Sequence, residues 1–175
     1  MEIRIGVFAT ILDDQGRVLL CHRRDHDFWG QPGGGLESGE TPWHGVMREV
    51  KEETGLDVAV SRLAGVYSAP TTNNLIFSFR CEATGGALTL NDEARDLRYF
   101  ALDALPANVF IEHAARIRDA IGATERTVLR MPGLPTATEQ VRLQLGHHNG
   151  HAASPPPGAL YCGGAAVRAE GDDTR

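Results

Sequence analysis

The sequence predicts an α+β fold in which a mixed β-sheet packs between helices. Two kinds of periodicity lead to this expectation. Apolar residues recur at every second position in several segments, as in β-strands, and at every third or fourth position in two others, as in amphipathic helices. The segments follow one another as strands, a helix, further strands and a second helix. That order favours a mixed sheet with helices packed against it.

Strands are expected where apolar and polar residues alternate or where short apolar runs occur. The first covers residues 3–11, and a turn at Asp13–Gly16 allows residues 17–23 to pair back on it. After the first helix, further strands are expected at 58–67, 75–82 and 97–100. The pair Gly85–Gly86 and the segment near Pro106 mark turns.

The segment Pro42–Glu53 is predicted to form the first helix. Thr41 can cap it, Pro42 suits the first helical position, and Gly55 suits a left-handed residue just past the last turn. Gly45 lies inside this helix and costs about 1 kcal/mol relative to alanine, which close packing against a neighbouring strand would explain. The buried stripe is expected to consist of Val46 and Val50, helped by Met47 or Trp43. A second helix is expected to end at Gly122, with an apolar face made of Phe110, Ala114, Ile117 and Ile121.

Three glutamates of the first helix share one face. Glu49, Glu52 and Glu53 stand at positions i, i+3 and i+4. Like charges at these spacings destabilise a helix by about 0.2–0.5 kcal/mol per pair. A hard divalent cation with oxygen ligands would offset this cost, and Arg48 could fork onto a carboxylate and fix its direction. The alternative is a solvated acidic face.

The loop before this helix is rich in glycine. It reads Gln31-Pro32-Gly33-Gly34-Gly35. Three glycines let the backbone approach a ligand closely and turn its carbonyl or N–H groups inward. A glycine triplet alone usually marks only a loop. Next to the carboxylate helix, it favours a ligand site over a solvated acidic face.

The run from Gly34 to Leu56 carries the most specific signal. It reads GGLESGETPWHGVMREVKEETGL and fits the spacing G-x5-E-x7-R-E-U-x-E-E-x-G-U, where U is a bulky aliphatic residue. Average residue usage puts a chance match at roughly one in a billion per starting position. The run resembles the signature of the Nudix hydrolases, and the stretch from about Ile3 to Ile121 resembles a whole Nudix domain.

The resemblance implies an α/β/α sandwich and the hydrolysis of a nucleoside diphosphate linked to another group, X. It implies Mg²⁺ as the cofactor, with Mn²⁺ able to substitute. Glu40 resembles the structural glutamate that pairs within the motif, and Arg48 resembles the residue that orients the metal ligands. The ligands themselves map onto Glu49, Glu52, Glu53 and the carbonyl oxygen of Gly34.

Hydrolysis also needs a carboxylate that accepts a proton from the attacking water. In the resembled family this base is sometimes a glutamate of the motif and sometimes a glutamate of a later loop. Glu52 or Glu53 is the candidate within the motif. Glu93, a few residues before an aromatic strand, is the best candidate outside it, and Asp96 is a weaker one. The alternative for Glu93 is an ordinary loop carboxylate.

Substrate contacts are expected from the loop before the motif. Arg23 could touch a phosphate and Phe28 could stack on a base, although an exposed loop charge is the alternative for Arg23. Trp29 and Tyr67 are further stacking candidates, but aromatic residues beside a strand more often belong to the core. The group X stays open among nucleoside triphosphates (including oxidised ones), ADP-ribose, other nucleotide sugars and dinucleoside polyphosphates.

Composition and charge argue against several other classes of protein. The hydrophobic content of 42% is that of an ordinary soluble protein, and the net charge of −6 argues against broad nucleic-acid or membrane binding. Cys21, Cys81 and Cys162 form no C-x-x-C pair, so a reducing compartment is expected. With neither a signal peptide nor a membrane span in the sequence, the cytoplasm is the expected location.

The 175 residues are expected to divide into a Nudix domain at 1–128 and an extension at 129–175. The extension is rich in proline and glycine, and it is expected to be flexible apart from a short helical patch at Ala137–Leu145. Its contacts could support a homodimer. Three histidines of the extension could bind a transition metal, with a solvated tail as the alternative: His147, His148 and His151.

A second functional class stays open beside the hydrolase. It is a nucleotide-binding or regulatory module that keeps the fold without turnover. Binding-only relatives often lack one of the ligating glutamates, whereas this sequence has Glu49, Glu52 and Glu53. The intact set favours the enzyme with a small nucleotide substrate.

Overall fold

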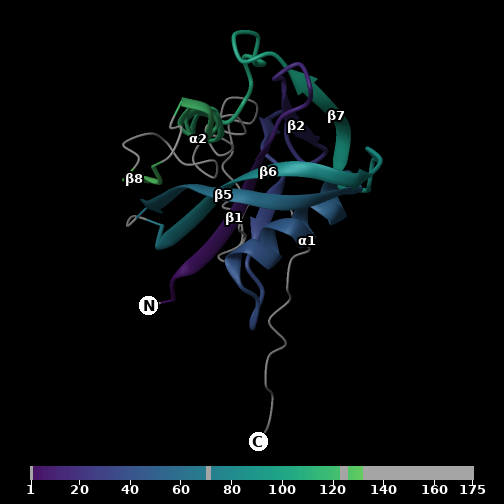
Figure 1. The fold of residues 1–175 in the computed structure, drawn as a ribbon. Coiled ribbons are helices and arrows are strands. Elements are labelled where there is room, and N and C mark those ends of the chain that lie inside the picture. The colour runs from purple at the N-terminus through teal and green to yellow at the C-terminus, as the bar shows by residue number, and fades with distance from the viewer. Residues whose placement is uncertain (1, 70–71, 123–125, 132–175) are drawn as a thin grey trace, which may run out of the picture.

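Two β-sheets and two helices make up the computed structural model, which describes residues 2–69, 72–122 and 126–131. The helices are α1 (Pro42–Thr54) and α2 (Ile111–Gly122) (Figure 1). The strands are β1 (Arg4–Ile11), β2 (Val18–Arg23), β3 (Trp29–Gly30), β4 (Gly33–Gly35), β5 (Leu56–Ala69), β6 (Asn74–Gly86), β7 (Ala94–Phe100) and β8 (Val128–Arg130).

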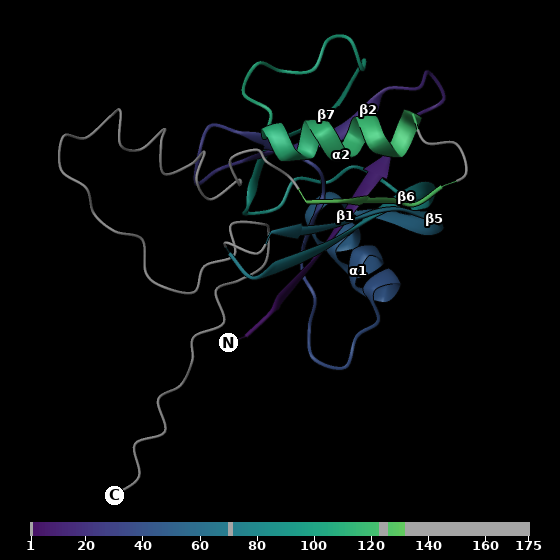
Figure 2. The same ribbon diagram turned by 90° about the vertical axis from the view of Figure 1, so that its left-hand side faces the viewer.

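The larger sheet is mixed, as the sequence predicts. Its strand order is β4-β1-β6-β5-β8. The pairs β1–β6 and β5–β8 are parallel, whereas β1–β4 and β5–β6 are antiparallel. Figure 2 shows α1 on one face of this sheet and α2 on the other. The expected sheet between helices is therefore confirmed.

Both faces of β1 are buried because each is covered by a helix. Val7 and Ile11 pack with Val46 and Val50 of α1 in the largest apolar cluster. Phe8 points to the opposite face, where its ring meets the edge of the His113 ring of α2 at a centroid distance of 4.9 Å. Alternate residues of a strand point to opposite faces, so this interior strand contributes to the packing on both sides of the sheet.

The expected pairing of residues 17–23 with the first strand is wrong. The turn itself forms: the Asp13 carboxylate accepts hydrogen bonds from the backbone N–H groups of Gln15 and Arg17 at 3.0 and 2.8 Å. Beyond the isolated bridge between Leu12 and Val18, the two strands separate. Both edges of β1 are occupied by β4 and β6, so β2 instead forms the centre of a smaller antiparallel sheet, β3-β2-β7.

The predicted features of α1 are confirmed. Thr41 accepts a hydrogen bond from the His44 backbone N–H, and Gly55 ends the helix in the left-handed conformation at φ +77°. The helix buries Val46 and Val50, while Trp43 stays half exposed. A Cβ at Gly45 would lie only 2.7 Å from the Leu36 side chain and 3.6 Å from that of Val7 in β1. Close packing therefore explains a glycine inside this helix.

The strands after α1 run longer than expected. β5 and β6 stay paired from Leu56 opposite Gly86 to Ala69 opposite Asn74. The glycines at 85 and 86 therefore belong to the end of the ladder rather than to a separate turn.

The boundary expected between residues 128 and 129 falls within β8, which pairs with β5. Residues 132–175 lie outside the described part of the chain, and with them the expected helical patch, the three histidines and Cys162. Where the chain is described, neither helix has the length and hydropathy needed to cross a membrane.

Candidate active site

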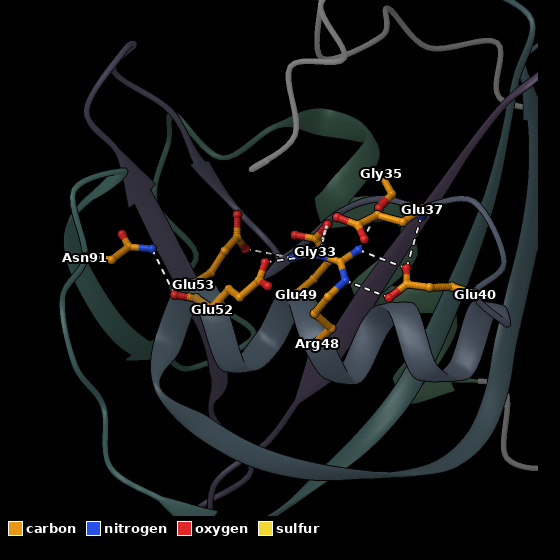
Figure 3. A network of polar contacts seen from close by, with 9 residues as sticks. All are labelled: Gly33, Gly35, Glu37, Glu40, Arg48, Glu49, Glu52, Glu53 and Asn91. Carbon is orange, nitrogen blue, oxygen red and sulfur yellow. Dashed lines mark hydrogen bonds and ion pairs between the residues drawn. The ribbon is translucent and has the colours of Figure 1, made fainter. Parts of the chain in front are cut away.

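The three glutamates of α1 project from the same side of the helix (Figure 3). Glu49 and Glu53 are buried, at 2% and 8% exposure, whereas the Glu52 side chain is 58% exposed. The helical spacing therefore produces one carboxylate face with two buried members and one member open to solvent.

Glu53 is held by the glycine-rich loop. Its Oε2 accepts a hydrogen bond from the Gly33 backbone N–H at 2.8 Å. Burial raises the pKa of Glu53 to about 8, and the nearby charge of Glu49 adds to the rise, while the Gly33 hydrogen bond opposes it. The loop and the helix thus meet at this carboxylate.

Glu49 is perturbed in the same direction. Burial raises its pKa to about 7 even though the guanidinium of Arg48 favours the ionised form. The charges of Glu52 and Glu93 raise it further. Two neighbouring carboxyl groups with raised pKa values are typical of sites that bind a cation or transfer a proton.

Arg48 connects the carboxylate face to the rest of the motif. Its Nε and Nη2 fork onto the Glu40 carboxylate at 2.7 and 3.0 Å, and Nη2 also donates to the Gly35 carbonyl oxygen at 3.1 Å. Its Nη1 donates to Glu49 Oε1 at 3.1 Å and to Glu52 Oε2 at 3.0 Å. The fork lies on Glu40, and a single nitrogen orients two of the three helix carboxylates.

If Arg48 orients metal ligands as the resemblance implies, replacing it with lysine is expected to lower the rate of the implied hydrolysis by about 10–100-fold, the usual cost of losing such a residue. A lysine carries the charge but cannot make the fork or the simultaneous bonds to four partners. The measurement is kcat with saturating metal ion. Arg17→Lys is the matched control, since Arg17 also bonds a carboxylate, at 2.7 Å from Asp13, but lies at a distant turn. Equal rates for the two variants would contradict the orienting role.

The other members of the glycine-rich loop lie along β4. Gly34 pairs in register with Val7 of β1, and Gly33 adopts φ +143°, a conformation that side chains rarely allow. A carbonyl oxygen has two lone pairs, so pairing in a sheet does not prevent a carbonyl from also binding a metal. The expected ligand role of the Gly34 carbonyl stays a prediction.

Glu93 lies close enough to the carboxylate face to act on it electrostatically. Its charge raises the pKa of both Glu49 and Glu53. Asp96, the weaker candidate, lies in β7 and forms an ion pair with Arg98 at 2.6 Å. The structure therefore brings Glu93 to the site and directs Asp96 to a separate pair.

Arg23 is the last residue of β2, and Phe28 lies in the loop between β2 and β3. Arg23 forks onto the Asp25 carboxylate at 2.9 and 3.0 Å, and its charge partly opposes the rise in the pKa of Glu53. Phe28 is half-buried, and one face of its ring stacks on Phe110 at a centroid distance of 4.7 Å. Both stay candidates for substrate contact.

Trp29 and Tyr67 are core residues. Trp29 is buried and stacks on the His22 ring at a centroid distance of 4.5 Å. Tyr67 is also buried, and its hydroxyl donates to Asp119 at 3.0 Å. Burial in the core, the alternative weighed for these two rings, is what the structure shows.

The donor set suits a hard cation. It consists of carboxylate oxygens, which Mg²⁺ prefers, and burial and mutual repulsion already oppose the ionisation of Glu49 and Glu53. Glu49 and Glu52 each give one oxygen to Arg48, which leaves a second oxygen on each. Among the described residues, no three acidic, histidine or cysteine side chains form a ready-made cage. Glutamate rotamers would therefore have to converge on a bound ion.

Two residues of the site were not identified from the sequence. Gly33 was visible only as part of a glycine triplet, and its contact with Glu53 depends on the packing of β4 against α1. Asn91 donates to the Glu52 carbonyl oxygen at 3.0 Å. The one signal for Asn91 was its place two residues before Glu93, a spacing that favours an Asx turn.

A family model, curated proteins and solved structures all match this chain. The model of the NUDIX domain matches residues 2–120. The chain is 37% identical over 116 residues to an ADP-ribose pyrophosphatase of Methanocaldococcus jannaschii, covering 62% of this chain and 68% of that protein. It is 31% identical over 144 residues to a putative 8-oxo-dGTP diphosphatase of Bacillus subtilis, covering 81% and 97%. The crystal structure of an ADP-ribose pyrophosphatase from Streptococcus suis has the same fold, with a TM-score of 0.66, 24% identity and coverage of 74% and 100%.

Proposed function

This chain belongs to the Nudix hydrolases, enzymes that act on phosphorus anhydrides, and we propose that it cleaves the pyrophosphate linkage of a nucleoside diphosphate linked to a group X in a Mg²⁺-dependent reaction. The observation that carries the proposal is the carboxylate face of α1. Two of its glutamates are buried with raised pKa values, and the third is open to solvent. Such a face combines cation binding with proton transfer.

The residues proposed to hold the ion are Glu49, Glu52 and Glu53, with the Gly34 carbonyl as a further ligand. When bound, Mg²⁺ would neutralise the diphosphate and lower the pKa of an attacking water, and Mn²⁺ is expected to substitute. Arg48 orients two of these glutamates through Nη1.

Glu93 is proposed as the base that accepts the proton from the attacking water, with Glu52 and Glu53 as the alternatives on α1. It lies outside the Arg48 network, and its charge reaches both buried glutamates. A base that is not itself a metal ligand keeps its oxygens for the water. Arg23 and Phe28 are proposed to contact phosphate and base.

The similar proteins leave the group X open. The archaeal relative is named for ADP-ribose and the bacterial one for an oxidised nucleoside triphosphate. Nucleoside triphosphates, ADP-ribose, other nucleotide sugars and dinucleoside polyphosphates all remain in the proposed substrate class. Each would bring a diphosphate to the same carboxylate face.

The proposal also includes the cellular compartment and the partners of the enzyme. Cys21 and Cys81 are free and buried, which fits a reducing compartment such as the cytoplasm. A homodimer supported by the extension stays a prediction, as does the absence of broad nucleic-acid binding at a net charge of −6.

The test is a panel of substrates measured with Mg²⁺ and, separately, with EDTA. The panel holds nucleoside triphosphates, ADP-ribose, nucleotide sugars and dinucleoside polyphosphates, and the products are separated by chromatography. Metal-dependent cleavage of one class well above the others would establish the activity and identify X. A folded, metal-binding protein without turnover of any compound would favour the silent nucleotide-binding module.

Stabilisation by Mg²⁺ is expected to grow as the pH rises from 6 to 9. The folded-state pKa values of Glu49 and Glu53, about 7 and 8, lie above their ordinary value of 4.5. Their contribution to metal-free stability is therefore fully present below about pH 4.5 and is lost as the pH rises through 7 and 8. A cation binds the ionised carboxylates and reverses this loss.

Thermal denaturation with Mg²⁺ and with EDTA at each pH measures the effect. The double variant Glu49→Gln/Glu53→Gln is the control, because its two side chains no longer titrate. A Mg²⁺-induced rise in melting temperature that is equal at pH 6 and pH 9 would contradict the ligand assignment.

A further inference from the structure

The loop from Ala87 to Asp92 is held against the C-terminal end of α1. The last carbonyl groups of a helix have no partner within the helix. Asn91 Nδ2 donates to the Glu52 carbonyl oxygen at 3.0 Å (Figure 3), and the Thr89 backbone N–H donates to the Thr54 carbonyl oxygen at 2.9 Å. The loop thus supplies partners that the end of the helix needs.

The same asparagine side chain also determines the shape of the loop that follows it. Asn91 Oδ1 accepts hydrogen bonds from the backbone N–H groups of Glu93 and Ala94 at 3.0 and 2.9 Å. An asparagine that bonds the backbone two and three residues ahead forms a stable turn. Because both ends of one amide are used, the backbone of Glu93 is fixed relative to the helix residue Glu52.

Glu93 is held from the opposite side as well. Its carbonyl oxygen accepts a hydrogen bond from the Arg24 backbone N–H at 2.9 Å. Two residues on, Arg95 Nε donates to the Arg23 carbonyl oxygen at 2.7 Å. Glu93 therefore lies between α1 and the segment that carries the proposed phosphate contact. Its main chain is bonded directly to Arg24 and is linked to α1 through the Asn91 side chain.

We propose that Asn91 is a positioning residue for hydrolysis, whose amide holds Glu93 beside the carboxylate face of α1 so that Glu93 can accept the proton of the attacking water. This inference rests on the proposed function for the reaction that it serves. Its physical basis is geometric, since a displacement of about 1 Å can cost roughly 100-fold in rate. The three hydrogen bonds of the Asn91 side chain limit such a displacement.

The first test separates rate from binding. Asn91→Ala is expected to lower kcat by about tenfold or more, while KM and the Mg²⁺ requirement change by less than about twofold, since no ligand or substrate contact is removed. Asn91→Asp keeps the acceptor for the two N–H groups but loses the donor to Glu52, so its kcat should lie between alanine and wild type. Ser61→Ala removes a comparable side-chain bond, to the Arg80 carbonyl at 3.0 Å, and should keep wild-type kcat.

A double-mutant cycle shows whether Asn91 acts through Glu93. Glu93→Gln removes the base, so adding Asn91→Ala to it should slow the enzyme no further than about twofold. Multiplied losses in the double variant would overturn the proposal, because Asn91 would then act by another route. A Glu93→Gln variant with near wild-type kcat would overturn it too.

A measurement without substrate keeps the inference independent of turnover. Residue-resolved amide hydrogen exchange of the ligand-free protein should show faster exchange at Glu93 and Ala94 in Asn91→Ala, and protection retained in Asn91→Asp. Unchanged exchange in Asn91→Ala would overturn the positioning role whatever the activity. A wild-type protein that cleaves nothing in the substrate panel would instead contradict the proposed function.

Discussion

Replacing Glu53 with glutamine is expected to lower kcat by at least about 100-fold while leaving the fold intact. The variant loses the charge of a proposed metal ligand. Metal ions typically supply several kcal/mol of transition-state stabilisation, and each 1.36 kcal/mol is a factor of ten in rate. The amide keeps the shape of the side chain, and its oxygen can still accept the hydrogen bond that Gly33 N–H makes with Glu53 at 2.8 Å. The measurement is kcat with Mg²⁺ on the best substrate of the panel.

A stability measurement shows whether the loss of kcat in Glu53→Gln comes from the site and not from unfolding. Burial raises the pKa of Glu53 to about 8, so at pH 9 the metal-free wild type must hold a buried charge that the glutamine variant lacks. The variant is therefore expected to melt at the same temperature as metal-free wild type or higher at pH 9. Glu82→Gln, at an exposed position on β6, is the control and should keep full activity. Near-normal turnover by Glu53→Gln would refute the ligand role.

Replacing Gly33 with alanine is expected to destabilise the protein by about 3 kcal/mol or more, a large share of the roughly 5–15 kcal/mol that stabilises a typical domain. Gly33 has φ +143°, and a Cβ there would lie 2.2 Å from the Val7 carbonyl oxygen and 2.7 Å from Phe8 Cα. Both contacts are with backbone, so no side-chain rotation can relieve them. The melting temperature should fall by about 10 °C or more.

Gly39→Ala is the matched control for this substitution. Gly39 also has a positive φ, +85°, but nothing lies within 4 Å of a Cβ placed there. Its cost should be only the intrinsic strain of a left-handed residue, about 1–2 kcal/mol. If the two variants melt within about 2 °C of each other, the close approach of β4 to β1 does not control stability. A Gly33→Ala chain that fails to fold while Gly39→Ala folds would support the prediction that this close approach controls stability.

Local features of the sequence were enough to predict α1 and its carboxylate face. Thr41 and Gly55 act at the ends of the helix through bonds to residues within four positions, and Glu49, Glu52 and Glu53 share a face because of helical periodicity alone. Such interactions do not depend on where the rest of the chain lies. The mixed sheet with helices on both faces followed from the order of the strands and helices.

Contacts between distant segments decided the arrangement of the strands and the burial of the aromatic rings. The sequence could not show that β4 and β6 occupy both edges of β1 and so direct β2 into a second sheet. It also could not show that Trp29 and Tyr67 are buried in the core.

The chemistry of the site depends on tertiary structure in the same way. The pKa of Glu53 is raised because β4 and its neighbours bury a residue that a bare helix would expose. Asn91 meets Glu52 only because the chain returns, 39 residues later, to the end of α1. The sequence by itself determined which carboxylates are present and how they are spaced, because spacing along a helix is local. Only the tertiary structure decided which of them are buried and oriented, because burial and orientation come from residues far away in the chain.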